Sequence, residues 1–130
     1  MLYVVFFARR RQEGIDFRVK MNWIPFYGKW QFLKTIEGLE RQKQFAFGSD
    51  IIGNFLMFIP FAFALHWISA KNYSHRIVIS AVFLTSFSFE TIQYLLNIGV
   101  ADVDDIVLNT LGGITGVLVC HFFNLKPSRN

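Results

Sequence analysis

The sequence predicts an all-α membrane protein, a polytopic transmembrane helical bundle, and two observations carry this prediction. Apolar residues make up 53% of the 130 positions and charged residues only 17%, whereas soluble domains carry roughly 25% charged residues. Three stretches of about 20 residues are long and apolar enough to cross a hydrocarbon core of about 30 Å as helices. The length suits one domain, residues 1–130.

The three stretches carry almost no charge. The first runs over residues 51–70 and has His66 as its only titratable group. The second runs over residues 77–96 and contains one charged residue, Glu90, and the third runs over residues 106–125 with no formal charge. Buried helices of soluble domains rarely reach such lengths three times in so short a chain, so all three are expected to be full spans.

The first residues are apolar but too few to cross a membrane. Met1–Ala8 is followed at once by Arg9, Arg10 and Arg11, and eight helical residues reach only about 12 Å. Positive charge follows the apolar run, whereas in a signal peptide it precedes it. We interpret Met1–Ala8 as a truncated N-terminal helix, with a short interfacial segment as the alternative.

Residues 9–50 form a basic, aromatic connection. Nine of the 13 Lys and Arg residues lie between Arg9 and Lys43. This favours membrane lipids with anionic headgroups as partners, and no nucleic acid, because long apolar runs adjoin the basic stretch. We expect an interfacial turn at Asn22–Tyr27 and an amphipathic connecting helix at Trp30–Lys43 lying on the membrane surface. A plain connection is the simpler interpretation of that helix.

We call the membrane face that carries residues 9–50 side A. The depth of each polar residue along its span predicts that these residues lie near this face. At a rise of about 1.5 Å per residue, the polar residues within the spans lie about 5 to 9 Å below side A. The others lie in the loop that returns to that face. The residues of this predicted functional cluster are Asn54, Glu90, Gln93, Asp102, Asp105 and Asn109.

Glu90 is the residue of this cluster that most needs explanation. An acidic side chain inside a span costs a few kcal/mol even on lenient insertion scales, so it is expected to face the bundle interior and to have a polar partner. Gln93 shares its helix face. The candidate partners are an Arg or Lys from residues 9–50, Asn54 and Asn109. The competing interpretation is that such residues only cap and join the helices.

Small residues in the third span predict helix packing. Gly112 and Gly116 form a GxxxG pair with Gly113 between them, which permits close helix approach in lipid. Packing within the bundle is the leading interpretation and dimerisation the alternative, so the oligomeric state stays open. Pro60 is expected to kink the first span, and Cys120 is expected to be a packing residue.

Motifs of common enzymes and cofactor sites are absent, so we expect no cofactor. The sequence contains no GxSxG, HExxH, Walker or dinucleotide motif. Asp102–Asp105 lacks the length and glycine of an EF-hand, although its carboxylates could supply ligands to a divalent cation. Side B, the opposite face, has His66 and His121 nearby without carboxylate or cysteine neighbours at ligand spacing, so no metal site is expected there.

Four motifs, taken together and in order, resemble the VanZ-like family. They are Asn22–Phe26, similar to its N-L-x-P-F element; Asn54–Phe61, similar to N-x-x-x-F-x-P-x-G; Phe89–Gln93, similar to F-E-x-x-Q; and Asp102–Gly113, similar to D-x-x-D-x-x-x-N-T-x-G-G. The resemblance covers residues 22–119. Ala62 stands where the family motif has glycine, and Val100 and Ala101 stand where many members carry an arginine.

The resemblance implies a multi-pass protein of the bacterial inner membrane with a role in the cell envelope. The founding protein of the family is associated with reduced susceptibility to teicoplanin, and the resemblance implies no particular reaction. The leading hypothesis is an envelope factor that binds a lipid, a lipid-linked precursor or a partner at the side A cluster. The alternatives are a metal-dependent membrane enzyme that uses Glu90, Asp102 and Asp105 on a lipid headgroup, and a structural assembly subunit.

The sidedness of the cluster has two interpretations. Side A carries nine Lys and Arg residues and side B carries four, so the positive-inside rule places side A in the cytoplasm. Action against an extracellular glycopeptide would be easier from a cluster that faces outward.

Overall fold

The structure is a computed structural model, and it describes residues 21–68, 74–96 and 100–123. Its elements in chain order are β1 (Met21–Asn22), α2 (Tyr27–Thr35), the 3-10 helix η2 (Ile36–Gly38), α3 (Arg41–Ile68), α4 (His75–Leu96), β2 (Ala101–Asp102) and α5 (Val103–Phe122). The predicted truncated helix, Met1–Ala8, lies outside the described residues.

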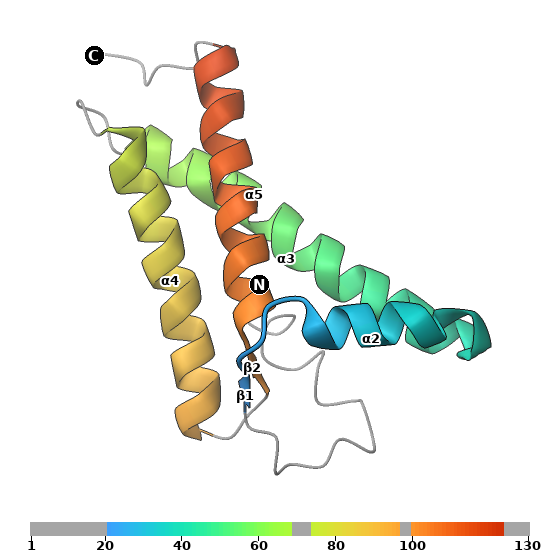
Figure 1. Cartoon of the computed structure of the whole chain (residues 1–130). Coiled ribbons are helices and arrows are strands. Elements are labelled where there is room, and N and C mark those ends of the chain that lie inside the picture. Colours follow the sequence, from blue (N-terminus) through green and yellow to red (C-terminus); the bar gives the residue numbers. More distant parts are fainter. Residues whose placement is uncertain (1–20, 69–73, 97–99, 124–130) are drawn as a thin grey trace.

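Helices α3, α4 and α5 form the bundle, and each is long and apolar enough to cross a membrane. Helix α4 lies alongside α5, and α3 crosses α5 at a steep angle (Figure 1). Many large apolar side chains on these helices are exposed, as expected of surfaces that face lipid rather than water. The all-α transmembrane bundle predicted from the sequence is therefore confirmed.

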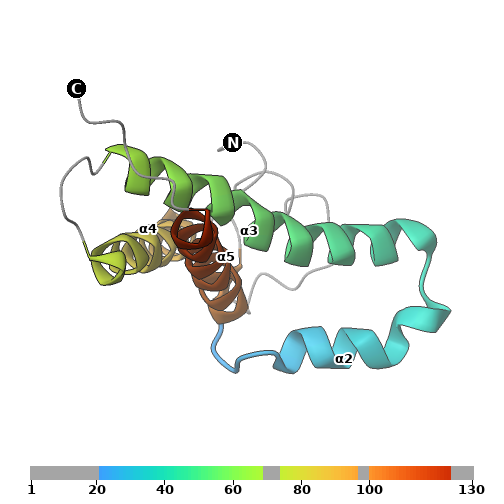
Figure 2. The ribbon, with the colours of Figure 1, turned by 90° about the horizontal axis from the view of Figure 1, so that it is seen from above.

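The segment before the first span differs from its prediction. Helix α3 has 28 residues, begins at Arg41 rather than at residue 51, and is about 42 Å long. The predicted amphipathic helix Trp30–Lys43 is wrong in its extent, because the chain turns back between Gly38 and Arg41. Figure 2 shows α2 and the first half of α3 as two arms of a hairpin that projects from the bundle.

Two contacts hold this hairpin together. The rings of Phe32 on α2 and Phe47 on α3 stack with centroids 4.3 Å apart. Gln44 donates hydrogen bonds from Nε2 to the carbonyl oxygens of Ile36 and Leu39, at 2.7 and 3.0 Å. The first turns of α3 are thereby bonded to the backbone at the end of η2, which holds the two arms of the hairpin together.

Glycines of α5 lie where the bundle helices meet. A Cβ atom on Gly112 would lie 2.1 Å from the carbonyl oxygen of Phe55, and one on Gly116 would lie 2.5 Å from that of Ile59. Both contacts are with α3. A Cβ on Gly113 would lie 2.6 Å from a methyl group of Val82 on α4. The α5 backbone therefore touches both neighbours at distances that side chains would prevent.

Two further residues of the first span fit this arrangement. Ala62 is fully buried, and its Cβ lies 3.1 Å from where a Cβ on Gly116 would be, so a methyl group is accommodated at this position of the crossing. Pro60 is exposed and lies inside α3, which continues through it. The missing N–H of proline leaves one carbonyl of the previous turn without its usual partner.

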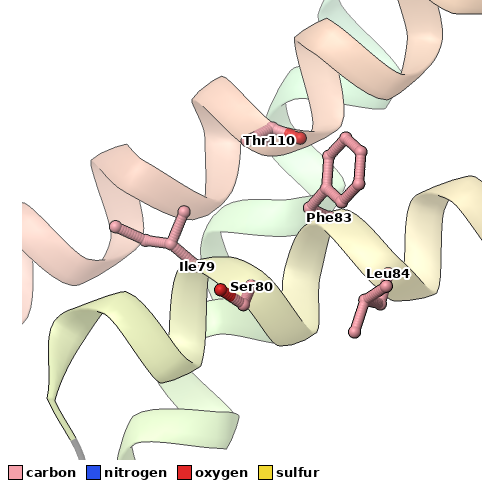
Figure 3. A pocket seen from close by; sticks show the side chains of 5 residues that line it. All are labelled: Ile79, Ser80, Phe83, Leu84 and Thr110. Atoms are coloured by element: carbon pink, nitrogen blue, oxygen red, sulfur yellow. The ribbon is translucent and has the colours of Figure 1, made fainter.

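A groove of about 520 Å³ lies in the outer surface between α4 and α5. Figure 3 shows Thr110 on α5 above a row of α4 side chains. The residues that line the groove are Ile79, Ser80, Phe83, Leu84 and Thr110. None of them belongs to the predicted cluster, and the largely apolar lining is typical of a crevice that lipid chains fill.

Candidate functional site

Asp102 is the residue at which the described elements of side A meet. It is the N-cap of α5, and its Oδ1 accepts a hydrogen bond of 2.9 Å from the backbone N–H of Asp104. Oδ1 also accepts from Asn22 Nδ2 at 3.1 Å. The same two residues, Asn22 and Asp102, are partners in the short parallel pairing of β1 with β2. The start of α5 is therefore fixed both by a cap and by the segment that leads into α2.

Lys29 of α2 inserts into a group of four aspartates. Its side chain is only 9% exposed. Its Nζ lies 3.1 Å from Asp102 Oδ2, 3.3 Å from Asp105 Oδ1, 3.4 Å from Asp104 Oδ2 and 3.9 Å from Asp50 Oδ2. One cation thereby joins the surface helix α2 to α3 and α5, and it stabilises carboxylates that burial would otherwise penalise.

Burial and charge act in opposite directions on this lysine. Desolvation by burial is the largest single influence and lowers the pKa of Lys29, whereas the carboxylates of Asp105, Asp102 and Asp50 raise it. Together the carboxylates prevail, and the pKa of Lys29 is raised above the ordinary value of 10.5. The ammonium group therefore stays charged throughout the physiological range of pH.

The turn before α2 reinforces this attachment. Phe26 caps α2 in a left-handed backbone conformation with φ of 60°, which is unfavourable for a bulky aromatic residue. Its backbone N–H donates to Asp104 Oδ1. The carboxylate thus holds the strained turn in place, and the Asn22–Phe26 and Asp102–Gly113 motifs contact each other directly.

Glu90 faces the interior of the protein. It is 4% exposed, and its Oε2 accepts a hydrogen bond of 2.7 Å from the backbone N–H of Asp102. This partner is a backbone group, which is not among the side chains considered from the sequence. Gln93, one turn further along α4, is also buried. The bond ties the end of α4 to the residue that caps α5.

The two asparagines of the cluster lie at the side A end of the α3–α5 crossing. Asn109 is 5% exposed and donates from Nδ2 to Ser86 Oγ on α4 at 2.8 Å. Asn109 lies one turn before Gly112, which meets Phe55, the residue after Asn54. Among the described residues, the donor atom Asn54 Nδ2 and the acceptor atom Asn109 Oδ1 are buried without a hydrogen-bond partner.

Each member of the predicted cluster thus lies at the side A end of the bundle, but the residues divide into two layers. Asp102 and Asp105 bind Lys29 in the outer layer. Asn54 and Asn109 lie deeper, between α3 and α5, and Glu90 connects α4 to the outer layer. Whether these residues carry the function stays a prediction.

Lys29, Asp50 and Ser86 were not among the residues predicted from the sequence. Lys29 is one of several lysines in a basic stretch, and nothing in the order of residues distinguishes it from those that face headgroups. Ser86 carries no signal either, since a lone serine in a span usually bonds its own helix.

Lys29, rather than a metal-ligating arrangement, lies at the centre of the outer layer. Within residues 21–68, 74–96 and 100–123, no group of three or more His, Cys, Asp or Glu side chains is arranged to hold a metal ion. The ammonium group of Lys29 lies between the carboxylates, where a divalent cation would otherwise lie. No observation on the described residues specifically favours the metal-dependent enzyme.

Comparison with known proteins identifies the family of this chain. The chain matches the VanZ/LLP1 family over residues 1–124. It is similar to Protein VanZ of Enterococcus faecium, with 34% identity over 68 residues, or 52% of this chain and 42% of that protein. The matched part thus spans less than half of that relative's length. No solved structure matches the chain. Because the family match extends over most of its length, this membrane protein belongs to the VanZ/LLP1 family.

Proposed function

We propose that the protein is a cell-envelope factor of the bacterial inner membrane that binds a hydroxyl-bearing headgroup, of a lipid or a lipid-linked precursor, at side A. One observation carries the proposal, namely the unsatisfied pair Asn54 Nδ2 and Asn109 Oδ1. A buried polar atom without a partner costs roughly 1–3 kcal/mol. A ligand whose hydroxyl groups reach these atoms would relieve both costs, because a hydroxyl can accept from the donor and donate to the acceptor.

The surroundings of the pair support a headgroup as the ligand. From their depth along the spans, both asparagines are expected about 5 Å below side A, within reach of polar headgroups. The adjoining helix α2 exposes Tyr27 and Trp30, and the segment before it exposes Trp23; these residue types favour the headgroup level. An aromatic surface at that level can accommodate the glycerol or sugar part of a lipid next to the buried amides.

Lipid binding tests this proposal directly. In native mass spectrometry, the detergent-purified chain should retain phosphatidylglycerol in preference to phosphatidic acid. The headgroup of phosphatidylglycerol carries two hydroxyls, whereas phosphatidic acid has the phosphate but no glycerol headgroup. Asn54→Leu should reduce that preference by roughly 5-fold or more, the equivalent of one hydrogen bond. Equal retention of both lipids by the wild-type chain would contradict the proposal.

Asn54→Leu should reduce the lipid preference without reducing the stability of the ligand-free protein. Asn54→Leu removes a buried donor that has no partner in the ligand-free protein, so the unfolding temperature in detergent should stay the same or rise. Exposed Gln42→Leu, near the start of the same helix, is the matched control and should change neither lipid preference nor stability. A large destabilisation by Asn54→Leu would show that Asn54 is a structural residue.

We also propose that the envelope role includes altered teicoplanin susceptibility, as the family resemblance implies. Glu90→Gln is expected to keep the fold, since the glutamine oxygen can still accept a hydrogen bond from the backbone N–H of Asp102. The free energy of unfolding should fall by about 1 kcal/mol, because the acceptor is no longer charged. The variant should lose the effect on susceptibility. Measuring the minimum inhibitory concentration in a strain that lacks the gene, complemented with either form, tests this. If cells that carry Glu90→Gln were as susceptible to teicoplanin as cells that carry the wild-type protein, Glu90 would have a structural role only.

Sidedness is testable with two engineered cysteines after Cys120→Ser. Following the positive-inside rule, we propose that side A is cytoplasmic. Gln31→Cys on α2 and Ser74→Cys before α4 place exposed thiols on sides A and B respectively. A membrane-impermeant maleimide should label the residue-74 thiol in intact cells and the residue-31 thiol only after lysis. The reverse pattern would place the cluster outside.

A further inference from the structure

The groove between α4 and α5 runs from near side B into the apolar part of the bundle. Four of the five side chains that line it come from α4, and Figure 3 shows Thr110 of α5 on the other side. Helix α4 begins at His75 on side B, so Ser80 lies about 7 Å and Leu84 about 13 Å from that end of the helix. The polar interfacial layer of a bilayer is about 5–8 Å thick on each side. Ser80 is therefore expected at the boundary of this layer, and Leu84 within the hydrocarbon.

An apolar groove in a bilayer does not stay empty, because its lining would lose dispersion contacts on the open side. Two kinds of apolar occupant are available, namely an acyl chain of a lipid and a helix of another polypeptide. Both are as apolar as the lining, so the hydrophobic effect does not distinguish between them. The polar groups at the side B end of the groove therefore determine which occupant fits.

Ser80 supplies a hydroxyl group at that end. The hydroxyl groups of Ser88, Thr91 and Thr110 each donate to the carbonyl oxygen four residues earlier in their own helix. Ser80 is exposed and makes no hydrogen bond through its side chain with any residue that the structure describes. The ester carbonyl oxygens of phospholipids lie at this depth and can accept from it. A second helix has its backbone carbonyl oxygens already bonded within itself, so the lipid is the better partner.

Arg76 adds a positive charge on the same side of α4. It lies one turn before Ser80, so the two residues share a helix face. The Arg76 side chain is exposed and forms no ion pair with the described part of the chain. The first turn of α4 contains no acidic residue, so the positive end of the helix dipole adds to this charge. A guanidinium group binds phosphate through paired hydrogen bonds, and phosphate is a group that phospholipids have and apolar helices lack.

We propose that the groove between α4 and α5 holds one acyl chain of a phospholipid from the side B leaflet, with the phosphate on Arg76 and a glycerol ester oxygen accepting from Ser80. The phosphate, ester and acyl levels of the lipid then match successive turns of α4, from Arg76 through Ser80 to Leu84. This site goes beyond the headgroup proposal, which concerns hydroxyl groups at side A, and it uses neither of the two buried asparagines.

Photo-cross-linking of the full-length chain in dodecyl maltoside, a detergent without phosphate, tests the proposal. The probes are phosphatidic acid and diacylglycerol, each with a diazirine in the same acyl chain, and labelled peptides are mapped by mass spectrometry. Phosphatidic acid should label residues 79–84 and the peptide around Thr110 saturably. Diacylglycerol, which lacks the phosphate, should need about a 5-fold higher concentration or more, since a Lys or Arg near a membrane surface contributes about this factor.

Arg76→Gln should raise the concentration of phosphatidic acid for half-maximal labelling of the groove by about 5-fold or more and leave labelling by diacylglycerol unchanged. Arg41→Gln is the matched control, because it removes an exposed arginine at the start of α3 on side A. It should leave labelling of the groove as it is. If both probes labelled the groove equally in the wild-type chain, or if Arg76→Gln had no effect, lipid would merely surround the helices and the proposal would be overturned.

Ser80→Trp tests the groove itself, because an indole ring on this exposed position fills the space for the acyl chain. Ser88→Trp, also exposed on α4 but outside the lining, is the control for the added ring. Only Ser80→Trp should abolish labelling of the peptide around Thr110, with circular dichroism as the check on folding. Cross-links between two chains through the groove, without lipid labelling there, would assign the groove to a second copy and contradict the proposal.

Discussion

Lys29→Met is expected to destabilise the protein by about 3–5 kcal/mol, because it leaves a group of buried carboxylates without the cation that joins them. Lys29 Nζ lies within 4 Å of four aspartates, and methionine matches its length but supplies no charge. Helix α2 should detach from α5 as a result. Thermal unfolding in detergent, together with proteolysis of the α2 region, measures both consequences.

Lys34→Met on the same helix is the matched control. Lys34 is exposed, and its Nζ lies over the ring of Trp30, 5.7 Å from the ring centroid. Such a contact at an exposed site contributes about 0.5–1 kcal/mol. If Lys29→Met were no more destabilising than Lys34→Met, the ion cluster could not be what attaches α2 to the bundle.

The effect of pH on this attachment follows from the raised pKa of Lys29. A group whose pKa is higher in the folded protein contributes its full stability below the unfolded value of 10.5 and loses it as pH rises through the folded value. The difference in stability between wild type and Lys29→Met should therefore be constant near neutrality and shrink above pH 10.5.

Gly112→Ala is expected to prevent close packing of α5 on α3. The added methyl group would lie 2.1 Å from the carbonyl oxygen of Phe55, a backbone atom that cannot move without displacing the helix. Overpacking typically costs about 1–3 kcal/mol and occasionally more, and we expect at least the upper end of that range here. The yield of folded protein and its unfolding temperature in detergent provide the measurement.

Gly53→Ala controls for the general effect of glycine replacement in a span. A Cβ at Gly53 would meet no atom within 4 Å, and alanine is the better helix former by about 1 kcal/mol, so this variant should be neutral or more stable. Equal stability of Gly112→Ala and wild type would mean that α3 and α5 do not pack through this glycine. Cross-linking should show whether either substitution also alters an oligomer.

The sequence predicted the three spans because lipid imposes a minimum length and an apolar composition on them. It did not predict where α3 begins. Most of residues 41–50 are polar or charged, so a search for apolar length stops at Ile51, yet a helix continues into the headgroup region wherever its own residues permit. The break at Gly38 was missed for a related reason, because the apolar periodicity from Trp30 to Lys43 does not register a change in chain direction.

The gathering of polar residues at one membrane face was predicted from the depth of each residue along its span, and this kind of prediction has limits. It could bring Glu90, Asp102 and Asn109 to one membrane face because helical rise converts sequence position into height. It could not identify the partner of each group. Lys29 lies outside the spans, where no depth could be assigned, and one partner of Glu90 is the backbone N–H of Asp102, a group that every residue other than proline carries.

The long sequence separations within the Lys29 cluster bear on how the protein is made. Lys29 pairs with Asp102 and Asp105, 73 and 76 positions later in the chain, so these two partners emerge only after α3 and α4 have been synthesised. Until α5 enters the bilayer, the α2 segment must wait at the surface, held by its aromatic residues. Closure of side A is thus a late step in biogenesis, and a chain truncated before Asp102 should insert two helices yet leave α2 open to protease.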